Sequence, residues 1–130
     1  MLSIALMLSL LGCGEGSPQA KKVDVAAQIV ALKGTVDSKS NALTELAAGG
    51  SSCQAAVKDI IPLLNDEDAA VRRLAAYALG EIGVAAKAAV PELTKMLQDS
   101  DMTAVTAAIN ALRAIDPSKA PKEAIPSVTQ

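Results

Sequence analysis

Two stretches that decide the fold are residues 55–83, AAVKDIIPLLNDEDAAVRRLAAYALGEIG, and residues 88–116, AAVPELTKMLQDSDMTAVTAAINALRAID. The second repeats the first after 33 residues, without a gap. A fixed period of this length is typical of a solenoid, in which one supersecondary unit stacks on the next. The identical pairs run through the whole match: Ala55, Ala56, Val57, Leu64, Asp66, Asp68, Ala75, Ala78, Leu79 and Ile82 match Ala88, Ala89, Val90, Leu97, Asp99, Asp101, Ala108, Ala111, Leu112 and Ile115.

Each copy contains two helical patterns joined by an acidic turn. Apolar residues recur at helical spacing in Cys53–Asn65 and again in Ala69–Ile82, which predicts two helices with one buried face each. Carboxylates in the turn at 66–68 are expected to cap the second helix, and Gly83 is expected to end it in the left-handed conformation. The predicted core positions are Val57, Ile60, Ile61, Leu64, Val71, Ala75, Ala78, Leu79 and Ile82, followed by Val90, Leu93, Leu97, Ala104, Ala108, Ala111, Leu112 and Ile115.

Weaker helical patterns flank the two copies. Val23–Leu32 and Ser38–Ala48 precede them, and a loop at 49–52 separates the latter from the first copy. Ala120–Val128 follows and is predicted to open another unit. Alternating strand patterns are absent from the sequence. Residues 23–130 are therefore predicted to form an all-α, right-handed α-solenoid of stacked antiparallel helix pairs, with about two full repeats and flanking half-repeats.

The motifs in the first copy resemble HEAT repeats, in particular the short bacterial type also found in phycobilisome lyases. The resemblance lies in a D-x4-V-R element that begins at Asp66 and in the A-x2-ALG-x-IG element at 75–83. It implies a ladder of ion pairs between neighbouring units, which here would use Asp66, Arg72 and Asp99. In the second copy Val105 stands at the position of Arg72, so the ladder is expected to stop there.

The same resemblance implies that the second helix of each unit lines a concave surface. Tyr77 is therefore a candidate for a partner-binding surface, although it equally covers the edge of the core. Arg73 is a candidate for contact with an acidic partner, although a solvated surface charge is its favoured role. Cys53 is predicted at a helix start, where a thiolate is stabilised, but no base lies near it in the sequence. Packing, rather than reactivity or pairing between chains, is the favoured role of this cysteine.

Composition excludes several classes of function. The chain of 130 residues has no histidine, which removes the commonest general base and the commonest metal ligand. Its net charge is −2 with no basic block, so nucleic acid is not an expected partner. We therefore predict no catalytic, metal or cofactor-binding residue and no small-molecule substrate.

The first thirteen residues, MLSIALMLSLLGC, are apolar or small and end in Cys13. They are too few to span a bilayer, which needs roughly 20 apolar residues, but they suit the apolar region of an export signal. The segment Leu10–Cys13 resembles the lipobox of bacterial lipoproteins, which implies cleavage after residue 12, a lipid on Cys13 and a tether over 13–22. No lysine or arginine precedes Glu15, unlike most signal peptides, so a hydrophobic helix that caps the solenoid is the alternative.

Taken together, these features predict a non-enzymatic protein–protein interaction module, tethered to a bacterial membrane by the lipid on Cys13. The residue after the cysteine is Gly14 rather than aspartate, which by resemblance indicates the outer membrane, facing the periplasm, in a host with two membranes. The alternative is a fragment of, or an accessory subunit related to, a HEAT-type bilin lyase. The identity of the partner, the oligomeric state and the completeness of the chain at either end stay open at this stage.

Overall fold

The computed structural model describes residues 22–122, and within them every regular element is helical. The α-helices are α2 (Val25–Ala31), α3 (Val36–Gly49), α4 (Val57–Ile60), α5 (Ala69–Ile82), α6 (Val90–Lys95) and α7 (Met102–Ile115). The 3₁₀ helices are η1 (Gly50–Ala56), η2 (Ile61–Asn65), η3 (Gly83–Ala89), η4 (Met96–Gln98) and η5 (Pro117–Lys119). The signal predicted at 1–12, the tether predicted at 13–22 except for its last residue, and most of Ala120–Val128 lie outside the described residues.

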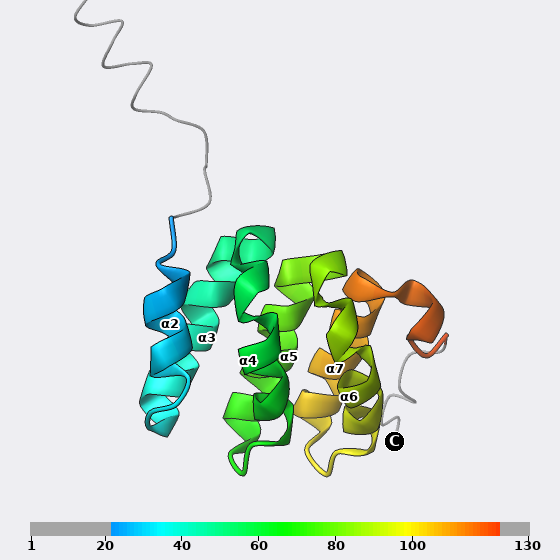
Figure 1. Ribbon diagram of the computed structural model, residues 1–130. Coiled ribbons are helices and arrows are strands. Elements are labelled where there is room, and N and C mark those ends of the chain that lie inside the picture. Colours follow the sequence, from blue (N-terminus) through cyan, green and yellow to red (C-terminus); the bar gives the residue numbers. More distant parts are fainter. Residues whose placement is uncertain (1–21, 123–130) are drawn as a thin grey trace, which may run out of the picture.

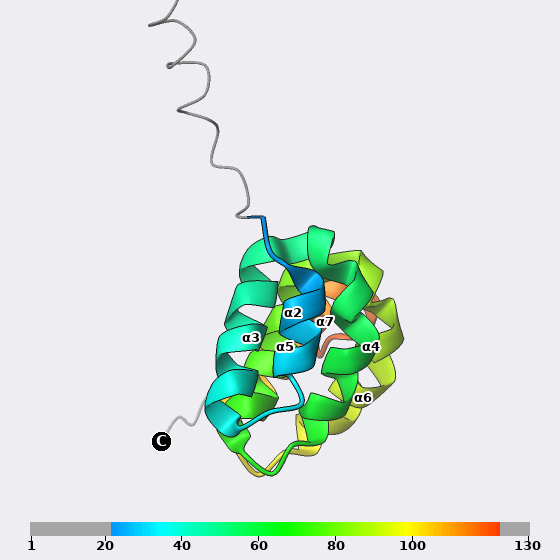
Figure 2. The same cartoon turned by 60° about the vertical axis from the view of Figure 1, so that its left-hand side comes forward.

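The helices form two layers that advance together along the chain. In Figure 1, α2, α4 and α6 follow one another in one layer, and α3, α5 and α7 follow one another behind them. The turned view in Figure 2 separates the layers, with α3 and α4 on opposite sides of the stack. Helix α5 packs between α3 and α7, so that consecutive units share one continuous core. The predicted all-α solenoid of stacked helix pairs is confirmed.

The three helices of the second layer have the same kind of N-terminal cap. The side chains of Thr35, Asp68 and Asp101 cap α3, α5 and α7, each by accepting hydrogen bonds from backbone N–H groups of the first turn. These caps are spaced 33 residues apart, so the repeat extends one unit further toward the N-terminus than the sequence match suggested. Helix α3 accordingly begins at Val36, not at Ser38, because Thr35 acts as its cap rather than as part of a break.

The first helix of each unit is not the single α-helix that was predicted. Cys53 (φ −98°, ψ 18°) and the equivalent Ala86 (φ −91°, ψ 18°) both interrupt the helical backbone. Pro62 follows in η2, where its missing N–H removes an α-helical hydrogen bond and favours tighter 3₁₀ turns. The predicted helix at 53–65 is therefore divided into the end of η1, α4 and η2.

This tightening changes which residues are buried. A 3₁₀ helix has three residues per turn, so its inward face shifts relative to that of an α-helix. Leu63 and its equivalent Met96 are buried, although neither was predicted in the core. Ile61 and Leu97, which were predicted there, are only partly buried. The other predicted core positions of the two copies are buried, apart from the partly buried Val90.

The turn after α5 depends on glycine. Gly83 has φ 81° and ψ −144°, and Gly50, the equivalent residue after α3, has φ 55° and ψ −137°. The expected positive φ at Gly83 is present, but its ψ places it outside the left-handed helical region, in backbone space almost restricted to glycine.

Ala69–Gln98 is long and apolar enough to cross a membrane by length and composition alone. However, the turn at Gly83 bends this stretch into α5 and α6, which lie in different layers (Figure 1).

The first described unit differs from the later ones at two neighbouring positions: one side chain is missing, and the other is larger. Gly49 occupies the position that Ile82 and Ile115 occupy in later units, and Cys53 occupies the position of Ala86. A Cβ atom at Gly49 would collide with the Cys53 sulfur, so the thiol fills the space that the missing side chain leaves. Cys53 is fully buried at the bend rather than exposed at a helix start, which makes it a packing residue.

Candidate functional site

Arg72 on α5 joins its own unit to the next. Its Nε and Nη2 atoms donate to Asp99 Oδ2 at 2.7 Å and to Oδ1 at 3.0 Å, a bidentate pair. Its Nη1 atom donates to the backbone carbonyls of Asp66 at 2.8 Å and Glu67 at 3.1 Å. One guanidinium therefore fixes both the turn before α5 and the turn before α7.

The carboxylate of Asp66 has a different partner from the one predicted. Lys39 on α3 donates to Asp66 Oδ2 at 2.6 Å, whereas Arg72 contacts only the backbone oxygen of Asp66. Lys39 precedes Asp66 by 27 residues, as Arg72 precedes Asp99. The ladder thus consists of Lys39–Asp66 and Arg72–Asp99, and Lys39 is the member that sequence reasoning missed. The 33-residue step from Lys39 to Arg72 is the signal that would have identified it.

The ladder holds both acceptors in the ionised form. The hydrogen bond from Arg72 lowers the pKa of Asp99 below its ordinary value, and burial opposes this change. For Asp66 burial is the largest single influence and raises the pKa, but the hydrogen bonds from Lys39 and the Asp68 backbone outweigh it and the pKa is lowered overall. The charged carboxylates therefore bind Lys39 and Arg72 more strongly than the protonated ones would, so the contacts between units depend on the ionisation of Asp66 and Asp99.

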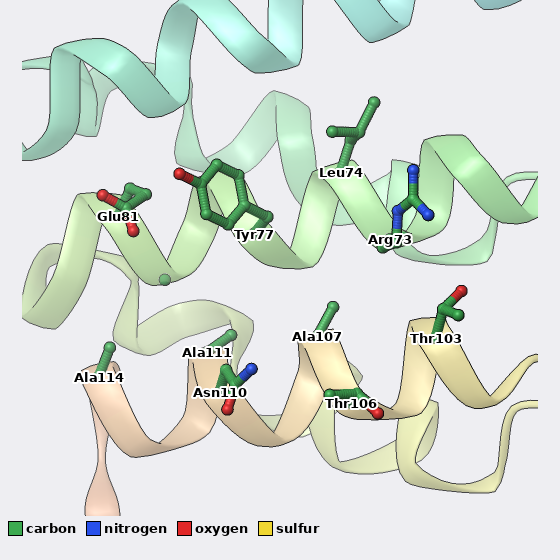
Figure 3. Close-up of a pocket in the computed structure, with 11 residues that line it drawn as sticks. Arg73, Leu74, Tyr77, Glu81, Thr103, Thr106, Ala107, Asn110, Ala111 and Ala114 are labelled. Carbon is green, nitrogen blue, oxygen red and sulfur yellow. The ribbon is translucent and has the colours of Figure 1, made fainter.

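A groove of about 490 Å³ lies between α5 and α7, on the layer formed by α3, α5 and α7. In Figure 3 its side chains come from two facing rows, one on each helix. The floor is narrow because Gly80 approaches α7 closely: a Cβ atom there would lie 3.1 Å from the Cα atom of Ala111. The groove is lined by Arg73, Leu74, Tyr77, Gly80, Glu81, Thr103, Thr106, Ala107, Asn110, Ala111 and Ala114.

The structure places Arg73 and Tyr77, the two candidate surface residues, at this groove together with Glu81 and Asn110. Tyr77 is 52% exposed, so much of its side chain is accessible to a binding partner. Arg73, Glu81 and Asn110 are exposed as well, and their polar groups make no hydrogen bond or ion pair with any other residue in the range 22–122. The groove therefore offers a cation, a carboxylate, a phenol and an amide to a binding partner.

The groove combines hydroxyl, amide and charged side chains. Its hydroxyl groups come from Thr103, Thr106 and Tyr77, and its lining includes no serine, cysteine or histidine. Among residues 22–122, no three carboxylate, cysteine or histidine side chains gather where they could hold a metal ion. What remains is a surface with one large aromatic side chain and unpaired polar groups, a composition common at protein interfaces.

Comparison with known protein families explains this arrangement. The family model for HEAT repeats matches residues 30–113 and 57–130. The chain belongs to the HEAT-repeat family. HEAT repeats generally mediate protein–protein interaction, and the α3–α5–α7 layer of this HEAT protein carries the groove just described. No curated protein and no solved structure matches the chain.

Proposed function

We propose that this HEAT protein is a non-enzymatic interaction module that binds a protein partner on its α3–α5–α7 layer. The observation that supports this proposal best is the groove between α5 and α7, with exposed Tyr77 between Arg73 and Glu81. Tyrosine and arginine are enriched among the residues that dominate binding energy. Among residues 22–122, the exposed large apolar side chains outside this layer are Val30 on α2 and Val84 on η3, which lie far apart in the sequence.

The same proposal includes attachment to a bacterial cell envelope through a lipid on Cys13, with release of the signal at 1–12. The sequence LLGC and the apolar run before it support this part. A single acyl chain binds membranes only marginally, so stable anchoring requires more than one chain. Bacterial lipoproteins of this type carry three, and a short tether would then leave the HEAT domain beside the membrane.

Two experiments test the two parts separately. A photo-crosslinking amino acid at position 77 in the intact chain should form adducts with a protein in cells, whereas the same amino acid at Lys58, exposed on α4, should not. Equal labelling from both positions, or none from position 77, would contradict the binding face. For the anchor, the wild-type chain should fractionate with membranes and Cys13→Ser should move to the soluble fraction; a variant that stays with membranes would contradict lipidation.

A further inference from the structure

Helix α5 carries a row of three exposed side chains in which the charge runs from positive to negative. Arg73, Tyr77 and Glu81 are four residues apart, so they share one inclined row on the helix surface. Arg73 and Glu81 lie about 12 Å apart along the axis, too far to contact one another. Their nearest neighbours on the same helix face include no opposite charge, and both charges are unpaired within residues 22–122.

The row is prominent because both neighbouring helices carry smaller side chains at the same repeat positions. The hydroxyls of Thr44 and Thr106 are bound to backbone carbonyls of their own helices and do not reach outward. In Figure 3 the side chains of α7 that face the groove are small beside Tyr77 and Arg73. A surface that approaches this layer therefore meets the α5 row first. The flanking equivalents are Ser40, Thr44 and Ala48 on α3, and Thr106, Asn110 and Ala114 on α7.

We propose that this row is self-complementary and that the partner is a second copy of this chain, a proposal that rests on the proposed binding function of this layer. If the two α5 helices pack antiparallel about a two-fold axis through Tyr77, Arg73 faces Glu81 of the second copy. The reciprocal pair forms at the other end, and the two Tyr77 rings meet on the axis. A parallel arrangement would instead place like charges together, so the charge order selects the antiparallel one.

The geometry of helix packing agrees with this arrangement. Rows of residues four apart are inclined about 26° to the helix axis, so two such rows align when helices cross at about −50°, the commonest class. Helices α3, α5 and α7 have 14 residues each. At about 1.5 Å per residue and 8–10 Å between axes, they present a face of roughly 600 Å². This projected face is smaller than the roughly 800 Å² of accessible surface that each partner of a standard complex buries, so the dimer is expected to be weak and to form at high local concentration.

Sedimentation equilibrium of the full chain tests the proposal, with Cys13→Ser in every variant so that no lipid contributes to association. The wild-type surface should give a concentration-dependent dimer that dissociates as salt screens the charges. Arg73→Glu and Glu81→Arg should each weaken the dimer by about tenfold or more, because each converts two attractive pairs into two repulsive ones. The double variant, with both charges reversed, should restore the dimer to within about threefold, since it recreates the same pairs in reverse.

The matched control is Lys58→Glu on the opposite layer, which should leave the association unchanged, and circular dichroism should show that every variant is folded. A dimer that ignores both single reversals, or a double variant that stays monomeric, would overturn the pairing. A chain that is monomeric at all concentrations would overturn the proposal as a whole. If that monomer still forms position-77 adducts with a different protein, the proposed binding function stands and only self-association fails.

Discussion

Replacing Arg72 by alanine is expected to destabilise the solenoid far more than replacing its neighbour Arg73. Arg72→Ala removes two hydrogen bonds to the Asp99 carboxylate and two to backbone carbonyls at 66 and 67. It leaves Asp99, 90% buried by side-chain area, with the hydrogen bond from the Asp101 backbone. Removing one partner of a fully buried ion pair costs about 3–5 kcal/mol. Water can reach part of this site, so we expect a total loss of about 2–3 kcal/mol.

Urea denaturation followed by far-UV circular dichroism measures this difference directly. Against a total stability of about 5–15 kcal/mol for a domain of this size, the loss corresponds to a fall in Tm of about 10–20 °C. Arg73→Ala is the matched control, because Arg73 is exposed and makes none of these contacts; its effect should stay within about 0.5 kcal/mol. If the two variants unfold at the same urea concentration, Arg72 is an ordinary surface charge and the ladder does not stabilise the stacking.

Three further changes have defined outcomes. Leu79→Ala and Ile82→Ala should each lower the free energy of unfolding by about 2–5 kcal/mol, because both side chains are buried, while exposed Lys87→Ala should change little; similar unfolding midpoints would contradict the observed core. Gly83→Ala should lower it by about 1–3 kcal/mol through backbone strain alone, since no atom lies within 4 Å of the added Cβ, and an unchanged stability would refute that reason. The pKa values of Asp66 and Asp99 are lowered in the folded chain, so the unfolded chain binds protons first as the pH falls. Their contribution to the free energy of unfolding is therefore fully present above about pH 4 and is lost as the pH falls through the folded-state pKa values. A denaturation series from pH 7 to pH 2 should show this loss, and it should be shallower in Arg72→Ala; equal slopes would mean that Asp99 does not contribute.

Several parts of the site could be predicted because they depend on residues close together in the sequence. Asp68 and Asp101 cap helices that begin at the next residue, and the core positions of α5 and α7 follow from helical periodicity. Tyr77 was predicted beside the buried face for the same reason. Lys39 was missed because its unit matches the others only weakly in sequence, although the 33-residue spacing from Lys39 to Arg72 was present.

By itself, the sequence determined the repeat period, the helical class and the inward positions of the second-layer helices. These features arise from capping and from apolar spacing within single helices, where the interacting groups are a few residues apart. Only the tertiary structure decided how the units meet. Whether Asp66 pairs with Lys39 or Arg72, and whether Cys53 fills the space beside Gly49, depends on side chains brought together by packing. The groove between α5 and α7 was decided in the same way, because its lining residues come from two helices that only the packing brings together.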